Sequence, residues 1–360
     1  MATALVQELK SAADEIVQRE LATPSVRSAA RGGGWSRDLW AATAAAGWAD
    51  VLLGEEHGGL GLGLDAAAGL FSVIGRHLVP GPYADLIVAL PLLYGHAPAA
   101  VQSHLDAARA GAEIVVLADP AATRSADDAD DTLELTGGSL TGSVGLVRHA
   151  AVADGFLVPV QDPAAGAMLA YVGASDPQVT LRPRESFDST SPVADVSFDR
   201  VAVAPHHLVS ATGQLAVSGL RARLRLMIAV ELAGLARHLL SASVSYVKLR
   251  EQFGKPIGSF QAVQQILAEM AVQLLGAEAL TAELAQSGET GLIEAVMAKG
   301  LTSEIARTIG EAALQVHGGV AFTEEFEDNR WYLHILTLHG LYGDHGDCYR
   351  VTGNALLIHE

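Results

Sequence analysis

The sequence predicts a mainly helical α+β protein in three parts: an N-terminal helical domain over residues 1–111, a small central β-barrel-like domain over 112–210, and a C-terminal four-helix bundle over 211–360. Three observations support this prediction. Apolar residues recur at helical spacing in the first part of the chain. Short apolar or alternating runs bounded by Asp, Gly, Pro and Ser follow. Long amphipathic segments joined by short turns then fill the rest, which is typical of an antiparallel bundle.

The composition excludes several classes of function. The chain has 23 basic and 41 acidic residues among 360, so its net charge of −18 repels nucleic-acid phosphates and anionic lipid. We find no uninterrupted apolar run of about 18 or more residues, so we expect no membrane span. The N-terminal "MATALVQELKSAADEIVQRE" lacks the basic flank and apolar block of a signal peptide, and we expect a cytoplasmic protein. The single cysteine, Cys348, permits no disulfide within the chain.

The N-terminal domain is predicted from three helical patterns. The first, "ALVQELKSAADEIVQREL", places apolar residues at i, i+3, i+4 and i+7. The second, "SRDLWAATAAAGWADVLL", has Ser36 as its expected N-cap. The glycines of residues 54–63 form a loop before the third helix, which begins at Asp65 and is ended by Pro80 and Pro82.

The central domain and the bundle follow from two further changes of pattern. The expected strands lie in "EIVVLAD", "TLELTG", "DGFLVPV", "AMLAYVG", "QVTLRP" and "ADVSFDRVAVAP". The expected bundle helices lie in "LRARLRLMIAVELAGLARHLLSASVSYVKLREQF", "GSFQAVQQILAEMAVQLLGAEALTAELAQS" and "LIEAVMAKGLTSEIARTIGEAALQVHGG", with a last helix that runs past Arg330.

Three segments resemble the acyl-CoA dehydrogenase family, and the resemblance covers nearly the whole chain. "GWADVLLGEEHGGLGLGL" is similar to the N-domain loop of the family, "REQFGKPIGSFQAVQQILAEM" to its helix-turn-helix, and "ALQVHGGVAFTEEF" to its Gln-x-x-Gly-Gly segment. The resemblance implies α,β-dehydrogenation of an acyl-CoA thioester, in which a carboxylate removes the α proton and FAD accepts the β hydride. It also implies an electron-transfer acceptor and a homo- or hetero-oligomer, with a dimer of dimers as the expected form.

The resemblance assigns FAD contacts to the polar turn after the first bundle helix. Arg250 matches the arginine that family members extend toward the FAD pyrophosphate, and a guanidinium fork suits a diphosphate. Phe253 would pack near the adenosine, and Gln261 would hydrogen-bond the ADP portion. Structural alternatives exist: Arg250 could complement the helix dipole, and Gln261 could be a solvated helix residue.

A second group of FAD contacts is implied at the end of the third bundle helix. Gln315, His317, Gly318 and Gly319 match the loop where the family's backbone approaches the cofactor closely, which glycine permits at low cost. The structural alternative for the two glycines is a helix C-cap. In the family both groups come from the neighbouring subunit, so the resemblance predicts that they reach across an interface.

The catalytic base of the family has no clear counterpart. Many members carry a glutamate after the Gly-Gly segment, and the matching position here is Tyr342, or Gly340 if a gap is allowed. Asp344 and Asp347 are near in sequence, but a shorter side chain displaced by a residue or two would miss the α carbon.

Other family members place the base on the first bundle helix. The position that matches is Leu224, which lies between two arginines. Glu231, about two turns further on, is the best carboxylate candidate for the base. The structural alternative is that Glu231 pairs with a basic residue, for example Arg237, or with the helical turn that contains Met227.

The flavin clamp of the β domain is also altered. The family's Thr-Glu-Pro-Gly-x-Gly-Ser-Asp and Trp-Ile-Thr/Ser segments correspond here to "LADPAATRSADD" and "GSVGLVRHAAVADG", which lack the tryptophan and the hydroxyl. The chain therefore keeps the half of the FAD site that reaches outward and has lost much of the half that holds its own flavin. Some bacterial members resemble this chain and pair with a complete sister subunit as α2β2, so we predict such a partner role.

The sequence also offers alternatives to this hypothesis. One is a non-catalytic structural subunit that stabilises a catalytic partner. Another is a metal site in "HILTLHGLYGDHGD", which gathers His334, His339, His345, Asp344 and Asp347. Their spacing fits none of the usual zinc patterns, so no metal is expected. The "GLGLG" run follows a helix and not a strand, which argues against a dinucleotide fingerprint.

Overall fold

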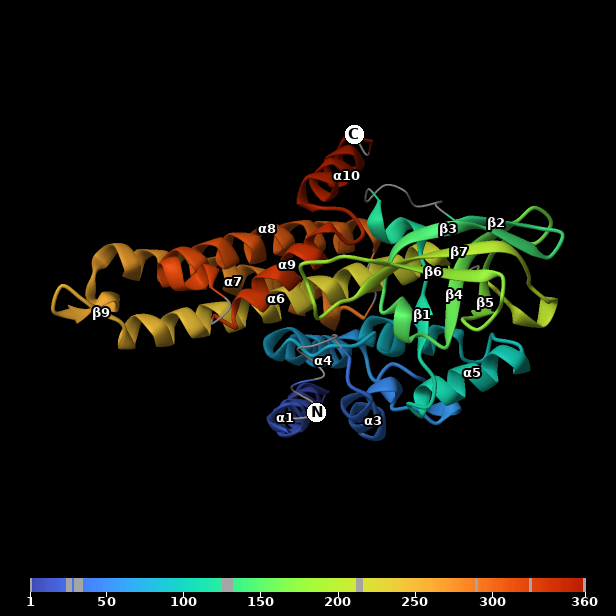
Figure 1. Ribbon diagram of the computed structural model, residues 1–360, viewed down its shortest axis with the longest axis horizontal. Coiled ribbons are helices and arrows are strands. Elements are labelled where there is room, and N and C mark those ends of the chain that lie inside the picture. The colour runs from blue at the N-terminus through green and yellow to red at the C-terminus, as the bar shows by residue number, and fades with distance from the viewer. Residues whose placement is uncertain are drawn as a thin grey trace.

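The computed structural model describes residues 2–23, 28, 35–124, 132–211, 216–288, 291–323 and 326–358. Helices form both ends of the chain and a β domain lies between them, so the predicted fold class is confirmed (Figure 1). The bundle extends away from the β domain and makes the molecule elongated. The three domain boundaries stay predictions.

The N-terminal helices lie beneath the bundle and the β domain in Figure 1. They are α1 (Ala2–Ala22), α3 (Arg37–Ala45), α4 (Leu64–His77) and α5 (Ala99–Arg109). Ser36 accepts a hydrogen bond from Leu39 N, which confirms it as an N-cap. The second predicted helix is shorter than expected: it ends at Ala45, and Gly47 turns the chain in a left-handed conformation (φ 76°).

The central strands form a folded sheet. They are β1 (Val115–Leu117), β2 (Leu133–Thr136), β3 (Ser139–Arg148), β4 (Gly155–Asp162), β5 (Gly166–Gly173), β6 (Val179–Arg184), β7 (Val193–Ala202) and β8 (Leu208–Ser210). Their order is β6-β7-β3-β2-β4-β5-β8, and β1 pairs with β4 in parallel. β2 joins the two halves because it is antiparallel to β3 and parallel to β4.

The sequence patterns missed the long strand β3. Two glycines, Gly142 and Gly145, interrupt its alternation, and its register with β7 shifts at bulges. The pairing with β7 still runs from Ser139 to Arg148. This strand matters for the site because its end carries Arg148 to the middle of the molecule.

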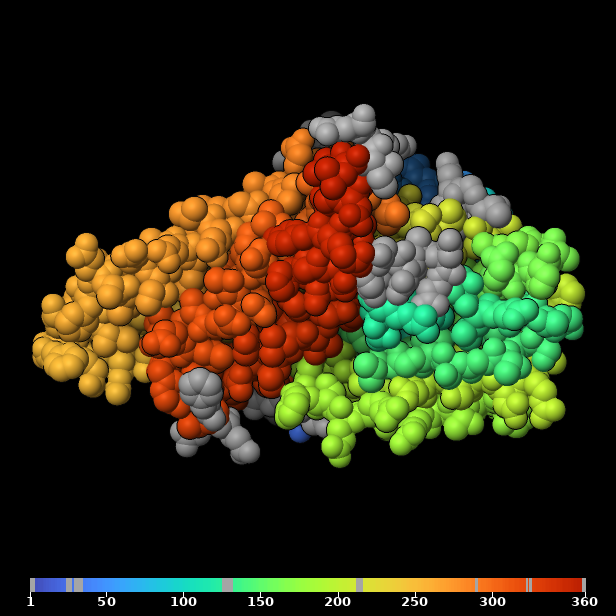
Figure 2. All heavy atoms as spheres, turned by 90° about the horizontal axis from the view of Figure 1, so that it is seen from above, coloured from blue at the N-terminus to red at the C-terminus, as the bar shows by residue number. Residues whose placement is uncertain are grey.

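The bundle helices are α6 (Val217–Leu249), α7 (Gln261–Gln286), α8 (Leu292–His317), α9 (Asn329–Gly340) and α10 (His345–Ile358). The predicted single last helix is two, because Tyr342 and Gly343 turn the chain at positive φ between α9 and α10. Seen from above, α10 (red) lies across the middle of the molecule (Figure 2). The hairpin of β9 (Glu251–Gln252) and β10 (Lys255–Pro256) forms the tip furthest from the β domain (Figure 1).

Helix α6 is the core of the fold. By length and composition it could cross a membrane, yet 72% of its most apolar window is buried inside the protein, against α4, α7, α8 and α9. A helix that is apolar on all sides is expected in such a core position.

Two glycines set the distance between α4 and α6. A Cβ on Gly75 would lie 2.2 Å from Glu231 O, and one on Gly234 would lie 2.6 Å from Ser72 O. The two backbones therefore touch, which only glycine allows.

Candidate functional site

A small cavity lies where the three parts of the chain meet. Its volume is about 60 Å³, which holds only a few water molecules. It is lined by α4 and the segment after it, by the ends of β1 and β3, by α6, and by the turn after α9. The lining residues are Phe71, Ile74, Gly81, Pro82, Tyr83, Ala84, Asp85, Val116, Leu117, Asp119, Ala122, Gly145, Leu146, Val147, Arg148, His149, Leu224, Ile228, Glu231, Leu341 and Tyr342.

A buried ion pair closes one side of the cavity. Arg221 of α6 binds Asp119 in a fork, with Nε–Oδ2 at 2.9 Å and Nη2–Oδ1 at 2.6 Å, and both side chains are 1% exposed. Asp119 Oδ1 also accepts from Ala121 N at 3.0 Å, which caps the turn after β1. Burying either charge without the other would cost free energy, so the two side chains are expected to stay paired.

The turn after α9 fills another side of the cavity. Tyr342 is buried, and its backbone N donates to Ala122 O at 2.8 Å. Arg225 Nε donates to Tyr342 O at 3.2 Å, and its guanidinium lies 5.6 Å from the ring centre. The tyrosine is thus fixed inside the space between the β domain and α6.

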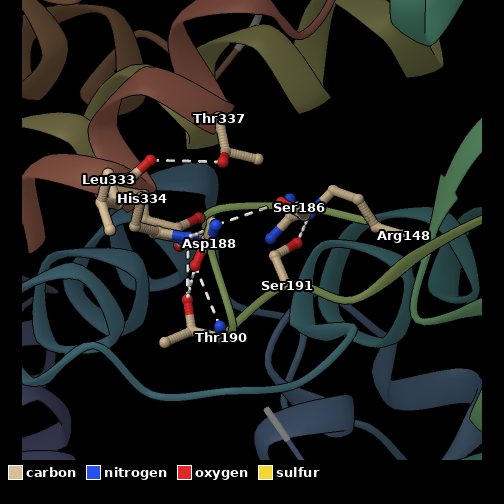
Figure 3. A network of polar contacts seen from close by, with 9 residues as sticks. Arg148, Ser186, Asp188, Thr190, Ser191, Leu333, His334 and Thr337 are labelled. Atoms are coloured by element: carbon tan, nitrogen blue, oxygen red, sulfur yellow. Dashed lines mark hydrogen bonds and ion pairs between the residues drawn. The ribbon is translucent and has the colours of Figure 1, made fainter. Parts of the chain in front are cut away.

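The end of β3 brings two more basic side chains to the cavity. Arg148 Nε donates to Ser191 Oγ at 2.6 Å (Figure 3). His149 is buried at positive φ (57°), and among the described residues neither ring nitrogen has a hydrogen-bond partner. Burial and the charge of Arg148 lower the pKa of His149 well below its usual range, so the ring is neutral.

A buried carboxylate faces these groups from the segment after α4. Asp85 Oδ1 accepts from Leu117 N at 2.7 Å. Burial raises the pKa of Asp85 to about 6, against the opposing effects of this hydrogen bond and of Arg148.

Beside the cavity, an imidazole lies between two buried carboxylates. His334 of α9 contacts Asp188 Oδ2 through Nδ1 at 2.7 Å and Glu231 Oε1 through Nε2 at 3.1 Å. Thr190 donates its hydroxyl and its backbone N–H to Asp188, as Figure 3 shows from close by. We call Asp188, His334 and Glu231 the carboxylate–histidine triad. It joins a β-domain loop to α9 and α6.

Within the triad, His334 is positively charged at neutral pH. Burial alone would lower the pKa of His334, but the Asp188 and Glu231 carboxylates raise it to about 9. Burial likewise opposes ionisation of Asp188, yet His334 and the hydrogen bonds from Thr190 hold its pKa well below the usual range. The imidazolium therefore neutralises part of the negative charge beside the cavity.

Only some of the candidate positions for the base line the cavity. Glu231, Leu224 and Tyr342 line it, whereas Gly340 and Asp344 do not. Glu231 does pair with a basic residue, as its structural alternative expected, but that residue is His334. The example given, Arg237, was wrong, because Arg237 pairs with Glu278 of α7.

Asp344 and Asp347 lie on the α9–α10 turn and at the start of α10. Asp344 Oδ1 accepts from Asp347 N at 2.9 Å, and neither residue is part of the cavity lining.

The predicted FAD contacts gather at the far tip of the bundle. They are Arg250, Phe253, Gln261, Gln315, His317, Gly318 and Gly319. Tyr246, one turn before Arg250, donates its hydroxyl to His317 O at 3.4 Å, so the ends of α6 and α8 meet. Figure 1 places this tip at the opposite end of the molecule from the β domain. These residues therefore cannot reach their own chain's cavity.

Most of this set is open to solvent. Phe253 is 93% exposed, and Arg250, Gln261, Gln315 and Gly319 are exposed as well. Gly318 has a positive φ of 68° after the end of α8, which glycine adopts readily.

The exception in the set is His317, whose ring is buried. It packs between Tyr246 and Phe326, with ring centres 4.4 and 4.5 Å away, and its Nδ1 donates to Ala313 O at 2.8 Å. Its side chain therefore supports the tip and does not project from it.

The clustered histidines do not form a metal site in the described part of the chain. No group of three or more His, Cys, Asp or Glu residues there could hold a metal ion. His339 Nε2 lies 2.9 Å from His345 Nδ1, and His334 belongs to the triad.

Sequence reasoning missed several groups at the cavity. Asp85 and the adjacent Arg148 and His149 carry no recognisable spacing, because two segments far apart in the sequence deliver them. Asp119 could have been found, since an Asp-Pro pair after a strand is a frequent capping signal. Residues 125–128 of the expected flavin-clamp segment lie outside the described residues.

Comparison with known proteins defines the class of protein. The family model "Acyl-CoA dehydrogenase, N-terminal domain" matches residues 3–101, and "Acyl-CoA dehydrogenase, C-terminal domain" matches residues 214–345. The chain belongs to the acyl-CoA dehydrogenase family.

Individual relatives sharpen this picture. The chain is 28% identical to acyl-CoA dehydrogenase FadE34 of Mycobacterium tuberculosis over 85% of its own length, but it spans only 40% of that protein. It is 27% identical to acyl-CoA dehydrogenase IpdE2 of the same organism, over 93% of this chain and 91% of IpdE2. A variant of the Tcur3481-Tcur3483 steroid ACAD superposes with a TM-score of 0.87 at 26% identity, over 99% of both chains.

Proposed function

We propose that this chain is a subunit of an FAD-dependent acyl-CoA dehydrogenase. It contributes half of an FAD site at its interface with a sister subunit. The assembly would carry out α,β-dehydrogenation of an acyl-CoA thioester. One observation carries the proposal: the residues that could bind FAD point outward at the tip, while the chain's own cavity measures about 60 Å³.

The residues around that cavity do not fit a flavin ring. The two segments that correspond to the family's flavin clamp, around Asp119 and Arg148, both line it. A tricyclic ring is far larger than a few water molecules. The space is occupied by Tyr342, held by Arg225, and is bounded by the buried pair of Arg221 and Asp119. Opening it would require breaking these contacts.

The residues at the tip fit a nucleotide diphosphate. Arg250 offers an exposed guanidinium that can form two hydrogen bonds to phosphate oxygens. Gln261, at the first turn of α7, supplies an amide for the ADP portion, and Gly318 and Gly319 allow close approach of the backbone. FAD, when bound by the sister subunit and this tip, supplies the hydride acceptor. This chain's residues hold and orient its diphosphate end.

Glu231 remains the candidate base on this chain. It lines the cavity, but one of its carboxylate oxygens already contacts His334. Because the cavity admits no thioester, we propose that the sister subunit removes the α proton and that Glu231 here serves the triad.

The proposal includes the surroundings of the enzyme. In an α2β2 assembly, the tip of each copy of this chain would contact a sister chain. An electron-transfer acceptor would take up the electrons released by the dehydrogenation. The Tcur3481-Tcur3483 steroid ACAD, a structure named for two chains, supports a heteromeric arrangement. We place the assembly in the cytoplasm.

The chain purified alone should be colourless or should contain much less than one FAD per chain, so its flavin absorption band should be weak or absent. Co-expression with a sister acyl-CoA dehydrogenase subunit should give a yellow complex, because the tip then meets a chain that holds the ring. The measurement is the ratio of flavin to protein absorbance of each preparation. A yellow homo-oligomer with one FAD per chain that oxidises acyl-CoA would contradict the proposal.

In the reconstituted complex, Arg250→Ala should weaken FAD retention at least tenfold, since a charge-assisted hydrogen bond to phosphate contributes about 1.5–3 kcal/mol. FAD content is measured after dialysis. Lys248→Ala, an exposed cation two residues earlier, serves as the matched control and should leave FAD content unchanged.

The same experiment tests the alternative function. A cavity of this small size is also what a non-catalytic structural subunit would have. If Arg250→Ala leaves the FAD content of the complex unchanged while removal of the whole subunit destabilises the partner, the chain has a structural role only.

A further inference from the structure

A second hollow lies at the end of the β domain that faces α5. Its volume is about 670 Å³, within the roughly 300–1,000 Å³ that is typical of small-molecule sites. Figure 1 shows α5 beside this end of the β domain, far from the tip of the bundle. We call it the α5 hollow, and its wall includes His104, Glu113, Asp154, Tyr171, Leu181 and His207.

The α5 hollow is separate from the cavity and from the tip. It shares no lining residue with the cavity, and none of the residues that could bind FAD belongs to it. The inference therefore does not rest on the proposed subunit role.

The Tyr171 side chain of β5 is buried in the wall of this hollow without a polar partner. Tyr171 is 5% exposed, and the His104 ring of α5 stacks on it with ring centres 4.1 Å apart. A Cβ on Gly155 would lie 2.5 Å from Tyr171 Oη, so the ring extends over the start of β4. In the described part of the chain its hydroxyl makes no hydrogen bond, although a hydroxyl can both donate and accept. Such a group gains free energy from any ligand that supplies a partner.

Two carboxylates of the hollow act on this hydroxyl, and each keeps one free oxygen. Glu113 Oε2 contacts His104 Nδ1 at 2.8 Å, and Asp154 Oδ2 accepts from Ile114 N at 2.8 Å. Among the described residues, Glu113 Oε1 and Asp154 Oδ1 make no hydrogen bond. Burial, Glu113 and Asp154 raise the pKa of Tyr171 above its usual range, so the negative charge of both carboxylates reaches the hydroxyl.

The α5 hollow lacks a matching positive charge. None of the described residues that line it is Lys or Arg. Burial, His206 and His104 lower the pKa of His207, so the His207 ring is neutral at pH 7. Even a protonated His104 would balance only one of the two carboxylates. The wall is therefore negative at neutral pH and favours a cationic ligand.

The polar groups of the wall favour a primary ammonium ion over other cations. Its three N–H donors match the Tyr171 oxygen and the two free carboxylate oxygens. A quaternary ammonium ion binds over an open aromatic face, but His104 covers one face of Tyr171. A metal ion is not favoured, because no group of three or more His, Cys, Asp or Glu in the described ranges could hold one.

We propose that the α5 hollow binds the primary ammonium group of a small aliphatic amine. The ammonium group donates to Tyr171 Oη and to the free oxygens of Glu113 and Asp154, and the carbon chain lies against Leu181. Hydrogen bonds between an ammonium ion and a carboxylate are charge-assisted and therefore strong. Binding also gives the Tyr171 hydroxyl the partner that it lacks.

The probe is 1,4-diaminobutane, titrated calorimetrically into the purified full-length chain at pH 7 in physiological salt. One saturable site is expected. Tyr171→Phe should weaken binding about tenfold without lowering the melting temperature, because the hydroxyl has no partner within the described chain. Glu113→Gln keeps an acceptor for His104 and should weaken binding by a similar factor. Glu185→Gln, an exposed acid of the β domain outside the hollow, is the matched control and should bind like the unaltered chain.

Three results would overturn the proposal. One is equal affinity of Tyr171→Phe and the unaltered chain for the diamine. Another is equal weakening by Glu113→Gln and Glu185→Gln, which would show only a general attraction of cations to a protein of net charge −18. The third is binding of 1,4-butanediol or tetramethylammonium as tight as that of the diamine, because the site would then recognise neither the charge nor the N–H donors. None of these readouts involves flavin, so they leave the subunit proposal untouched.

Discussion

Replacing His334 with glutamine should lower the free energy of unfolding at pH 7 by about 3–5 kcal/mol, the usual effect of removing one partner from a buried ion pair. The amide keeps most of the volume but leaves Asp188 and Glu231 as two buried carboxylates without a cation between them. Urea denaturation followed by circular dichroism measures the change. The matched control is His339→Gln on the same helix, where burial and Lys299 lower the pKa to about 4 and the ring carries no charge at pH 7.

The triad also predicts a pH dependence. The pKa of His334 is about 9 when folded and near 6.5 when unfolded. Its stabilisation is therefore fully present below pH 6.5 and is lost as the pH rises through 9. The unaltered chain should lose stability between pH 7 and 10, and the His334→Gln variant should lose much less over this interval. Equal slopes for the two proteins would show that His334 is not the titrating group.

Breaking the buried ion pair of Arg221 and Asp119 beside the cavity should lower the stability by a comparable amount. Arg221→Leu leaves the Asp119 carboxylate buried without its cation, so we expect a loss of about 3–5 kcal/mol in the free energy of unfolding. The double variant Arg221→Leu, Asp119→Asn should recover a large part of this loss, because it removes the unpaired charge while keeping a side chain that can accept from Ala121 N.

The double-mutant cycle separates pairing from simple loss of packing. A coupling energy of more than about 1 kcal/mol between the two positions is expected for groups in direct contact. Arg182→Leu, on the exposed strand β6, is the matched control and should change stability by less than about 0.5 kcal/mol. If the double variant is no more stable than Arg221→Leu alone, the ion pair is not what fixes this side of the cavity.

Several of the structural features were accessible from sequence because they are local. Ser36 was predicted as an N-cap from its position before an apolar-periodic segment, and the structure shows the capping hydrogen bond. The six expected strands overlap β1, β2, β4, β5, β6 and β7 because short alternating runs carry their own pattern. β3 was missed where Gly142 and Gly145 remove side chains from that pattern.

The candidate site shows the opposite situation. Glu231 was singled out from its helix, but its partner was expected four to six residues away and is His334, 103 positions further on. Asp188 is 146 positions from the same histidine. No spacing rule links three residues on a loop and two helices, since their approach depends on how α6, α9 and the β domain pack.

The sequence by itself determined the three-part plan, the family resemblance and the polar, glycine-rich segments at Arg250 and Gly318, because periodicity and short motifs are encoded by neighbouring residues. Only the tertiary structure decided that these segments share one exposed tip, that the chain's own cavity is almost filled, and that α4 and α6 touch at Gly75 and Gly234. These properties depend on distances between remote segments, and such distances are fixed by close packing of the whole core.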